Sequence, residues 1–298
     1  MKIVLLGHSG QVGRELLRSL PPTGEVVCPS RQASDFRDTT ELEVFIQRLK
    51  ADVVINAAAY TAVDRAETEP DLAYIINAKA PGAIARACKL AGSKFIHFST
   101  DYVFAGDKSD AYAESDVRAP LSVYGRTKAE GEDFVLESGA AALIFRTSWV
   151  HAAHGANFIR RILQLATERE SLSVVSDQVG SPTSARHISE VIALAIHRLR
   201  SGADFASGTY HLTSTGSASW HDVAQFALGR AVELGWSSRM APADIKAIPS
   251  HAYPTAAARP LNSRLNTHKL RSALDIDLPK WQIGVLQTVQ DIVEVMQK

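Results

Sequence analysis

Short apolar runs of strand length alternate with stretches of helical period through the first half of the chain. The runs are rich in Val, Ile, Leu and Phe and do not alternate with polar residues, which is typical of strands buried on both faces of a parallel sheet. The predicted strands are residues 3–6, 25–28, 52–56, 94–98 and 142–146. The predicted helices between them are residues 11–20, 40–49, 71–91 and 123–138. Right-handed crossovers between such units predict a doubly wound α/β sheet.

The pattern changes after about residue 147. Helical periodicity predicts helices at 156–169, 186–200, 219–235 and 281–297, and short apolar runs predict strands at 172–175 and 209–213. Residues 236–267 are rich in Pro, Ala and Ser and lack a clear period, so we expect an irregular loop or a small subdomain there. We interpret the change near residue 150 as a functional division and not as a linker.

Composition excludes several classes of protein. Of the 298 residues, 46% are hydrophobic and 21% are charged, so a sizeable core can form. The 32 basic and 32 acidic side chains balance, which argues against a nucleic-acid or acidic-membrane partner. The apolar run before Gly7 is too short for a signal peptide, and no stretch reaches the length of about 18 apolar residues that spans a membrane. Cys28 and Cys88 are expected to be buried free thiols, and we predict a cytoplasmic protein.

Glycines directly follow the first predicted strand and open the first predicted helix. Residues 7–13 read Gly-His-Ser-Gly-Gln-Val-Gly, with the spacing G-x-x-G-x-x-G. Glycine permits a tight turn and a close approach of the backbone to a pyrophosphate, which then lies on the amides of the helix N-terminus. The alternative is a glycine turn that only ends the strand. The position between strand and helix favours a dinucleotide site in a Rossmann-type fold.

The residues after the second predicted strand are expected to distinguish NADPH from NADH. An acid at this point binds the ribose 2′-hydroxyl, whereas an arginine accommodates a 2′-phosphate. The chain has Ser30 and Arg31 here and no acid before Asp35. We therefore predict NADPH as the cofactor, with weaker use of NADH. The alternative for Arg31 is a solvated surface charge.

Two further groups follow the third and fourth predicted strands. The small residues at 57–61 would let a flat cofactor lie against the backbone, although they also suit close packing against a helix. Thr100 follows the fourth strand, and Tyr124 and Lys128 are four apart on one face of the next helix. An ammonium beside the phenol would lower the pKa of Tyr124, and the Thr100 hydroxyl could hold the same substrate oxygen. The pattern gains weight from its place at the edge of the sheet that holds ligands.

The second half offers an aromatic surface and several arginines. Trp149 provides a flat apolar face, and an arginine such as Arg259 can make bidentate contacts with a phosphate. Trp149 would also suit a core, and Arg259 would also suit a surface ion pair. These residues are compatible with a phosphate-bearing substrate and do not by themselves establish one.

Together these residues resemble the extended short-chain dehydrogenase/reductase superfamily and, more closely, the dTDP-4-dehydrorhamnose reductase family. The marks run nearly end to end: GHSGQVG at 7–13, NAAAYTAVDRAE at 56–67, STDYVF at 99–104, YGRTK at 124–128, FRTSWV at 145–150, DQVGSPT at 177–183 and RPLNSRL at 259–265. The glycine turn and the Tyr-x-x-x-Lys spacing belong to the whole superfamily. The later blocks make the resemblance specific.

The resemblance implies reduction of the C4 keto group of dTDP-4-dehydro-L-rhamnose, the last step of dTDP-L-rhamnose synthesis for cell-surface polysaccharide such as the lipopolysaccharide O-antigen. It implies a Rossmann domain over residues 1–150 and a smaller mixed α/β substrate-binding region over 151–298, with helices that return to the first domain. The implied catalytic residues are Thr100, Tyr124 and Lys128. The residues expected to bind the cofactor are Gly7, Gly10, Gln11, Val12, Gly13, Ser30, Arg31, Asp35, Phe36, Ala57, Ala58, Ala59, Tyr60, Thr61, Tyr124 and Lys128. Those expected to face a dTDP-sugar are Thr100, Asp101, Phe104, Tyr124, Trp149, Asn157 and Arg259.

Two departures from the family pattern and two alternative functions remain open. Ser30 stands where family members often carry an acid, which puts NADH use in doubt. Some members hold a magnesium ion between subunits through glutamates. No acidic cluster in this sequence demands such an ion, so we predict no metal. We predict a homodimer as the assembly.

A sugar-nucleotide epimerase or dehydratase of the same superfamily is one alternative function. A dehydratase usually needs an acid/base carboxylate directly after the catalytic threonine, and Asp101 follows Thr100. The other is a non-catalytic subunit like the regulatory subunit of methionine adenosyltransferase, against which the intact Tyr124 and Lys128 argue.

Overall fold

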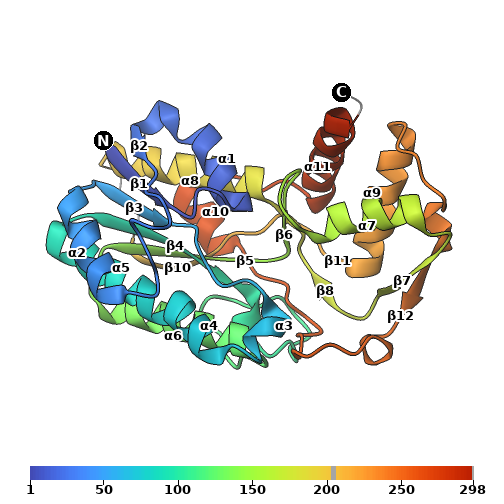
Figure 1. Ribbon diagram of the computed structural model, residues 1–298, viewed down its shortest axis with the longest axis horizontal. Coiled ribbons are helices and arrows are strands. Elements are labelled where there is room, and N and C mark those ends of the chain that lie inside the picture. Colours follow the sequence, from blue (N-terminus) through green and yellow to red (C-terminus); the bar gives the residue numbers. More distant parts are fainter. Residues whose placement is uncertain (203–205, 297–298) are drawn as a thin grey trace.

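A six-stranded parallel sheet forms the larger of two lobes in the computed structural model, which describes residues 1–202 and 206–296 (Figure 1). The strand order is β10-β5-β4-β3-β1-β2. The strands are β1 (Lys2–Leu6), β2 (Glu25–Val27), β3 (Val53–Asn56), β4 (Lys94–Thr100), β5 (Ala142–Thr147) and β10 (Gly208–His211). Every neighbouring pair is parallel. The five strands expected in the first half are therefore confirmed.

Helices cover both faces of this sheet, as predicted for a doubly wound fold (Figure 1). One face packs against α1 (Gln11–Ser19), α8 (Ala185–Arg200) and α10 (His268–Leu274), and the other against α2 (Thr39–Leu49), α5 (Ala80–Ala91) and α6 (Val123–Glu137). Each layer is an apolar core: Ile3, Leu16 and Ile192 lie in the first, and Val4 and Ile84 in the second. Successive side chains of a single strand pack into opposite cores, because side chains alternate between the two faces of a sheet.

The strand order sets the place where a ligand can bind. From β1 the chain first adds β2 on one side and then crosses to β3 on the other side. The helices that follow β1 and β3 therefore leave on opposite faces, which opens a crevice at the carboxyl ends of these two strands. The glycine turn and residues 57–61 lie at that crevice.

The smaller lobe comes from the second half of the chain (Figure 1). Its helices α7 (Phe158–Glu168), α9 (Trp220–Glu233) and α11 (Trp281–Met296) enclose a separate apolar core. Short strand pairs join its loops: β7 (Leu172–Val175) with β12 (Ile245–Ile248), β8 (Val179–Gly180) with β11 (Ala218–Ser219), and β6 (Val150–His151) with β9 (Thr183–Ser184). The final predicted helix is confirmed through residue 296, and residue 297 lies outside the described residues.

The second half also contributes to the larger lobe. Strand β10 pairs with β5, and α8 packs against α1. The sequence led us to expect that helices would return to the first domain, but it gave no sign that a strand would extend the sheet. The boundary near residue 150 therefore does not separate the two cores, and the functional division stays a prediction.

Two expectations from the sequence are wrong: a single helix over residues 71–91, and the burial of Cys28. The stretch 71–91 is not one helix: α4 (Pro70–Tyr74) and α5 are joined by a π-helix at Ile75–Lys79. Pro81 has no N–H for the carbonyl of Asn77, four residues earlier, and its ring crowds that carbonyl, so the turn widens. Residues 236–267 contain β12, which a tertiary partner strand stabilises without a local period. Cys28 is partly exposed, whereas Cys88 is buried; both are free thiols.

Candidate functional site

The glycine turn lies directly against the loop after β3. Gly7 has φ +76°, and a Cβ there would lie 2.4 Å from the backbone nitrogen of Ala58. Only glycine fits this conformation at this distance. Gly10 precedes the first residue of α1, Gln11, and no side chain caps this helix end. The first amides of α1 are therefore available to an anion such as a pyrophosphate.

The segment after β2 presents Ser30 and Arg31 on the surface. Ser30 Oγ accepts a hydrogen bond from the backbone nitrogen of Ala33 at 3.2 Å, which closes a turn. The next acid, Asp35, forms an ion pair with Arg37, with 2.6 Å between Oδ2 and Nη2. The hydrogen bonds from Arg37 lower the pKa of Asp35 to about 2. Phe36 is half-buried and packs on the core below.

The loop after β3 is held from below by buried amide side chains. Ala58 N donates to Asn56 Oδ1 at 3.0 Å, and Tyr60 N donates to Asn77 Oδ1 at 2.8 Å. The hydroxyl of Tyr60 donates to Glu69 at 2.6 Å. Residues 57–60 are partly exposed and Thr61 is exposed, so this backbone forms one wall of the crevice.

Thr100 and Tyr124 meet at the carboxyl end of β4. Ser122 caps α6 by accepting from Gly125 N at 3.2 Å, which places Tyr124 in the first turn of the helix. Gly125 lets this turn approach closely, since a Cβ there would lie 2.2 Å from the carbonyl oxygen of Tyr102. The phenol of Tyr124 then lies beside Thr100, which acts to lower the pKa of the phenol.

The pKa of Tyr124 is raised and not lowered as the sequence led us to expect. Burial raises it to about 12, although the hydrogen bond to Thr100 acts in the opposite direction. The expected effect of Lys128 is missing because its Nζ turns to the sheet, where it donates to the carbonyl oxygen of Phe98 at 2.6 Å. His97 Nε2 lies 3.3 Å from the same Nζ. Burial lowers the pKa of Lys128 to about 8, although Glu132 raises it.

Asp101 is a buried carboxyl beside the Thr100–Tyr124 pair. Its Oδ1 accepts from the Thr100 hydroxyl at 3.0 Å, and its Oδ2 accepts from the Ser148 hydroxyl at 2.8 Å. Burial raises the pKa of Asp101 to about 6, although hydrogen bonds from Ser148, Ser263 and Thr100 lower it. The side chain therefore orients the Thr100 hydroxyl and can hold a proton slightly below neutral pH.

Four residues expected to face the substrate have structural partners. Phe104 is fully buried and stacks on Tyr112, with 4.3 Å between ring centroids, so its expected place at the substrate is wrong. Trp149 is partly exposed, but Trp220 covers one of its faces at 3.6 Å between centroids. Asn157 caps α7 and donates to Gln11 at 2.9 Å, and Arg259 pairs with Asp64 at 2.8 Å.

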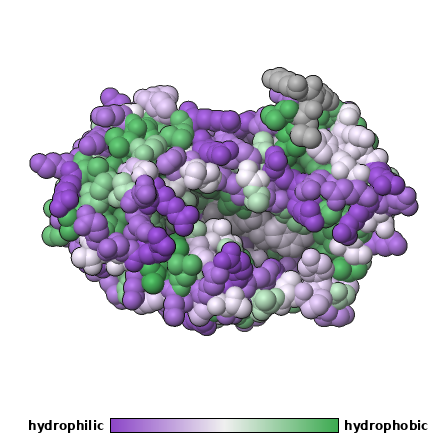
Figure 2. Space-filling view, in the orientation of Figure 1, coloured by the Kyte–Doolittle hydropathy of each residue, from purple (hydrophilic) through white to green (hydrophobic). Residues whose placement is uncertain are grey.

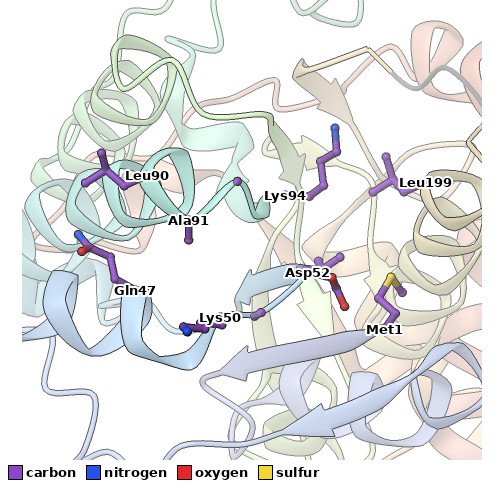
Figure 3. A pocket seen from close by; sticks show the side chains of 11 residues that line it. Met1, Gln47, Lys50, Asp52, Leu90, Ala91, Lys94 and Leu199 are labelled. Carbon is purple, nitrogen blue, oxygen red and sulfur yellow. The ribbon is translucent and has the colours of Figure 1, made fainter.

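The carboxyl edge of the sheet faces the smaller lobe, because β5 runs on into β6 (Figure 1). In the same orientation, Figure 2 shows that the molecular surface is hollowed near its middle, between the two lobes. A separate cavity of about 620 Å³ opens at the opposite edge of the sheet (Figure 3). Met1, Val53 and Lys94 line it at the amino ends of β1, β3 and β4, so it is remote from the glycine turn.

Comparisons with known proteins match nearly the whole chain. The family model described as RmlD substrate binding domain covers residues 1–294. The chain is 42% identical to dTDP-4-dehydrorhamnose reductase of Salmonella typhimurium, over 98% of both chains. It is 44% identical to the enzyme of that name from Burkholderia thailandensis, over 98% of this chain and 99% of the relative.

The chain belongs to the dTDP-4-dehydrorhamnose reductase family.

A solved member of the dTDP-4-dehydrorhamnose reductase family has the same fold. The reductase of Bacillus anthracis, determined in complex with NADP, aligns with a TM-score of 0.87 and 33% identity over 96% of this chain and 98% of that chain. The expected Rossmann-type architecture and the expected family are confirmed. The roles of individual residues stay predictions.

Sequence reasoning missed two buried polar residues of this reductase-family chain, His97 and Asn77. Both lie within predicted elements: His97 in the fourth strand and Asn77 in the helix after the third strand. The available signal was a polar side chain inside an otherwise apolar run, which is costly unless it has a partner. His97 contacts Lys128, and Asn77 holds the loop at Tyr60.

Two further properties concern the described residues only. No helix among residues 1–202 and 206–296 is long and apolar enough to cross a bilayer. Within the same ranges, no three side chains of His, Cys, Asp and Glu come together to hold a metal ion. The predicted cytoplasmic location and the predicted homodimer stay predictions.

Proposed function

We propose that this chain reduces the C4 keto group of dTDP-4-dehydro-L-rhamnose to the alcohol of dTDP-L-rhamnose, with NADPH as reductant. The carrying observation is the placement of Tyr124, in the first turn of α6, beside Thr100 at the carboxyl edge of the sheet, the edge that also carries the glycine turn. Family membership over nearly the whole chain supports the substrate, and the NADP complex of a 33% identical relative supports the cofactor.

The residues at the crevice fit a dinucleotide. The backbone contact between Gly7 and Ala58 leaves no side chain over the turn, and the first amides of α1 have no side-chain cap. Gln11, Val12 and Gly13 would lie along the pyrophosphate at this helix end. Residues 57–61 would line the nicotinamide half, and Ser30 and Arg31 the adenosine ribose.

Proton transfer to the substrate is assigned to Tyr124. Bound NADPH would supply a hydride for C4, which leaves negative charge on the carbonyl oxygen. A phenol with a pKa of about 12 is protonated at neutral pH and can donate its proton to that oxygen. Thr100 lies beside the same phenol, and its hydroxyl would hold the substrate oxygen there. Lys128 would return a proton to Tyr124 after the product leaves.

Binding of the dTDP-sugar is assigned to the cleft between the lobes. Trp149 has one face covered by Trp220 and offers its other face as a flat apolar wall. Asp101 would act on the sugar through Thr100, whose hydroxyl it holds. Arg259, paired with Asp64, and Asn157, bonded to Gln11, would shape the two ends of this cleft.

Asp101 favours one second candidate, a dehydratase of the same superfamily. Its carboxyl is buried beside Thr100 with a pKa of about 6, so it could exchange a proton with the sugar. A dehydratase would recycle its dinucleotide and show no net consumption of NADPH. A non-catalytic regulatory subunit would show no turnover of any keto sugar.

One assay separates these possibilities. The purified chain is given NADPH and a panel of sugar nucleotides that includes both 4-keto sugars and 4-hydroxy sugars, absorbance reports cofactor loss, and NMR identifies the product. Equal amounts of NADPH consumed and dTDP-L-rhamnose formed are expected. Product formation without NADPH loss would support the dehydratase, and no conversion of any substrate would support the non-catalytic role.

A further inference from the structure

Trp149 has a backbone conformation that bulky residues rarely adopt. Its φ is +48°, in the left-handed region, where the Cβ atom crowds the following carbonyl oxygen. The two other described residues besides glycine with a positive φ, Lys50 and Asp275, stand at the ends of helices, where this conformation is common. Trp149 lies between β5 and β6 and ends no helix. Contacts with its surroundings must therefore hold it in this conformation.

The main contact is a stack of aromatic rings that begins in the smaller lobe. The indole of Trp149 lies flat on that of Trp220, with 3.6 Å between centroids and 6° between planes. Phe158 packs against Trp220 in turn, at 4.7 Å between centroids. Trp220 is the first residue of α9 and Phe158 the first of α7, and both pack on the core of the smaller lobe. That core therefore supports the stack.

Gly180 of β8 holds the edge of the same indole. A Cβ on Gly180 would lie 2.6 Å from Cε2 of Trp149 and 2.8 Å from the hydroxyl oxygen of Ser263. The φ of Gly180 is not positive, so this position needs glycine for space and not for its backbone conformation. The carbonyl oxygen of Trp149 also accepts from Thr183 N at 3.3 Å. The residue is thus fixed at one face, at one edge and at its backbone.

The residue before Trp149 ties this arrangement to the catalytic edge of the sheet. The hydroxyl of Ser148 donates to Asp101 at 2.8 Å, and Asp101 accepts from Thr100 at 3.0 Å. Ser148 is buried, whereas Trp149 is partly exposed, so the chain reaches the surface at the indole. The ring is therefore one residue away from the group that orients Thr100.

We propose that Trp220 is a positioning residue, which holds the strained Trp149 ring in place before substrate binds, so that its uncovered face is a rigid wall for the sugar part of the substrate. This inference rests on the proposed function. Phe158 and Gly180 support the same arrangement. A wall that is ordered in advance loses little conformational freedom on binding, and this favours affinity without contact between Trp220 and the ligand.

Loss of Trp220 should release the ring. The stacking contact offsets the unfavourable left-handed φ of Trp149, so without it the backbone can return to an ordinary conformation and the indole turns away. Ser148 keeps its own bond to Asp101, and the Thr100 hydroxyl stays oriented. The expected defect is therefore in binding of the sugar nucleotide and not in the chemical step.

The first test observes the Trp149 ring directly, in the full-length chain without cofactor or substrate. The indole N–H groups are labelled with ¹⁵N, and the Trp149 signal is identified by its loss in Trp149→Phe. In Trp220→Leu we expect this signal to shift, because the ring current of Trp220 is removed. Its heteronuclear NOE should fall, because the indole becomes mobile on the ps–ns timescale.

The second test measures affinity for dTDP-L-rhamnose in the presence of NADP⁺, together with steady-state kinetics. In Trp220→Leu the Kd and the KM of the sugar nucleotide should rise about 10-fold, with kcat changed by less than about 3-fold and the Kd of NADPH unchanged. Trp220→Phe keeps a smaller ring under the indole and should give the same changes to a lesser extent. That variant decides the question if Trp220→Leu does not fold.

The control is the same substitution at another tryptophan of the same core. Trp236 lies just beyond the other end of α9, and its Nε1 donates to the carbonyl of Leu163 at 3.3 Å. Trp236→Leu should lower the melting temperature and leave the Trp149 signal and the Kd of dTDP-L-rhamnose as in the parent.

An unchanged Trp149 signal in the Trp220 variants would overturn the proposal. So would an equal rise of the Kd in Trp236→Leu and Trp220→Leu, because any loss of stability would then have the same effect. A parent chain that does not bind dTDP-L-rhamnose would contradict the proposed function. The NMR measurement needs neither turnover nor ligand, so it still decides whether Trp220 positions the ring.

Discussion

Tyr124, Lys128 and Asp101 all titrate away from the ordinary values of their side chains, and burial is the main cause in each case. Burial disfavours the charged form, which raises the pKa of the phenol and the carboxyl and lowers that of the amine. At neutral pH the phenol is therefore protonated. This agrees with an acid that protonates an alkoxide and not with a base that starts as tyrosinate.

Removal of the phenolic hydroxyl tests this role at a single residue. Tyr124→Phe should lower kcat by about 10²–10⁴-fold, the usual contribution of a positioned acid, with little change in substrate or cofactor binding. The control is Tyr210→Phe on the edge strand β10, which removes a hydrogen bond to the carbonyl of Ala206. Steady-state kinetics of both variants measure kcat, and NADPH titration of both variants measures cofactor binding. A kcat of the Tyr124 variant within a few-fold of the parent would contradict the assignment.

The raised pKa of Asp101 predicts a pH dependence of folding. The ordinary value is 3.8 and the folded value is about 6, so the folded state holds the proton to higher pH than the unfolded chain. The stability from this proton is complete below the lower value and is lost as pH rises through the higher one. The stability that is lost between these two pH limits is about 3 kcal/mol.

Asp101→Asn removes this dependence. The free energy of unfolding of the variant, relative to that of the parent, should increase by about 3 kcal/mol as pH rises from about 4 to about 8, because the parent loses stability and the variant does not. Urea denaturation at a series of pH values measures it. If the difference between the two proteins stayed constant with pH, the carboxyl would not titrate as described.

At the scale of elements, the shape of the glycine turn depends on close backbone contacts that leave no room for a Cβ atom. A Cβ on Gly13 would lie 2.1 Å from the carbonyl oxygen of Gly7, whereas a Cβ on Gly10 would meet the same oxygen at 3.4 Å. The first distance is a clash with an atom that cannot move independently. The second is ordinary contact.

Substitution by alanine at these two positions should therefore have different costs. Gly13→Ala is expected to lose about 1–3 kcal/mol of stability from overpacking, and Gly10→Ala less than about 0.5 kcal/mol. Thermal and urea unfolding of the chain without cofactor give both values. Equal losses in the two variants would show that the turn adapts, and that the contact with Gly7 does not define it.

We predict that the segment after β2 decides the choice of cofactor. Ser30 and Arg31 are exposed, so we expect them to contact a 2′-phosphate, whereas Asp35 is already paired with Arg37. A hydrogen bond to a charged group is worth about 1.5–3 kcal/mol, which corresponds to a preference for NADPH of roughly 10- to 150-fold, less where solvent screens Arg31.

The double substitution Ser30→Asp with Arg31→Ala should reverse this preference without a large change in kcat, because neither residue lies near the reacting carbon. The measurement is kcat/KM for NADPH and NADH in both proteins. A parent that uses the two cofactors equally, or prefers NADH, would refute this interpretation of the segment.

At the scale of the molecule, the glycine-turn helix is tied to the second half of the chain. Gln11 accepts from Asn157 at 2.9 Å, and Glu15 pairs with His154 at 2.8 Å. Both contacts join residues more than a hundred positions apart. They connect the expected pyrophosphate site to the start of α7 in the smaller lobe.

Asn157→Asp isolates this connection. The carboxylate can still cap α7 by accepting from the backbone nitrogen of Arg160, but it cannot donate to Gln11 or to the carbonyl of Ala152. The loss of about 1 kcal/mol should raise the Kd for NADPH about 5-fold, with the helix content unchanged. Fluorescence titration and circular dichroism test this. An unchanged Kd would show that the glycine turn is positioned without the smaller lobe.

Local periodicity determined the strands of the first half and most of its helices, although not the interruption at Ile75–Lys79, and parallel strands then bring their carboxyl ends to one edge. This is why residues as distant as Gly7, Thr100 and Tyr124 could be placed at one site from the sequence. The marks of the family, spread along the whole chain, supplied the substrate class, which no single motif carries.

Only the tertiary structure decided which partner each side chain meets. It placed β10 in the sheet, paired β12 with β7, enclosed Phe104 and brought the amino group of Lys128 to His97 and the carbonyl of Phe98. Strand pairing and burial depend on contacts between distant segments, which leave no period in the local sequence. The direction of each pKa shift depends on the same contacts, because burial and buried hydrogen bonds set the energy of a charge.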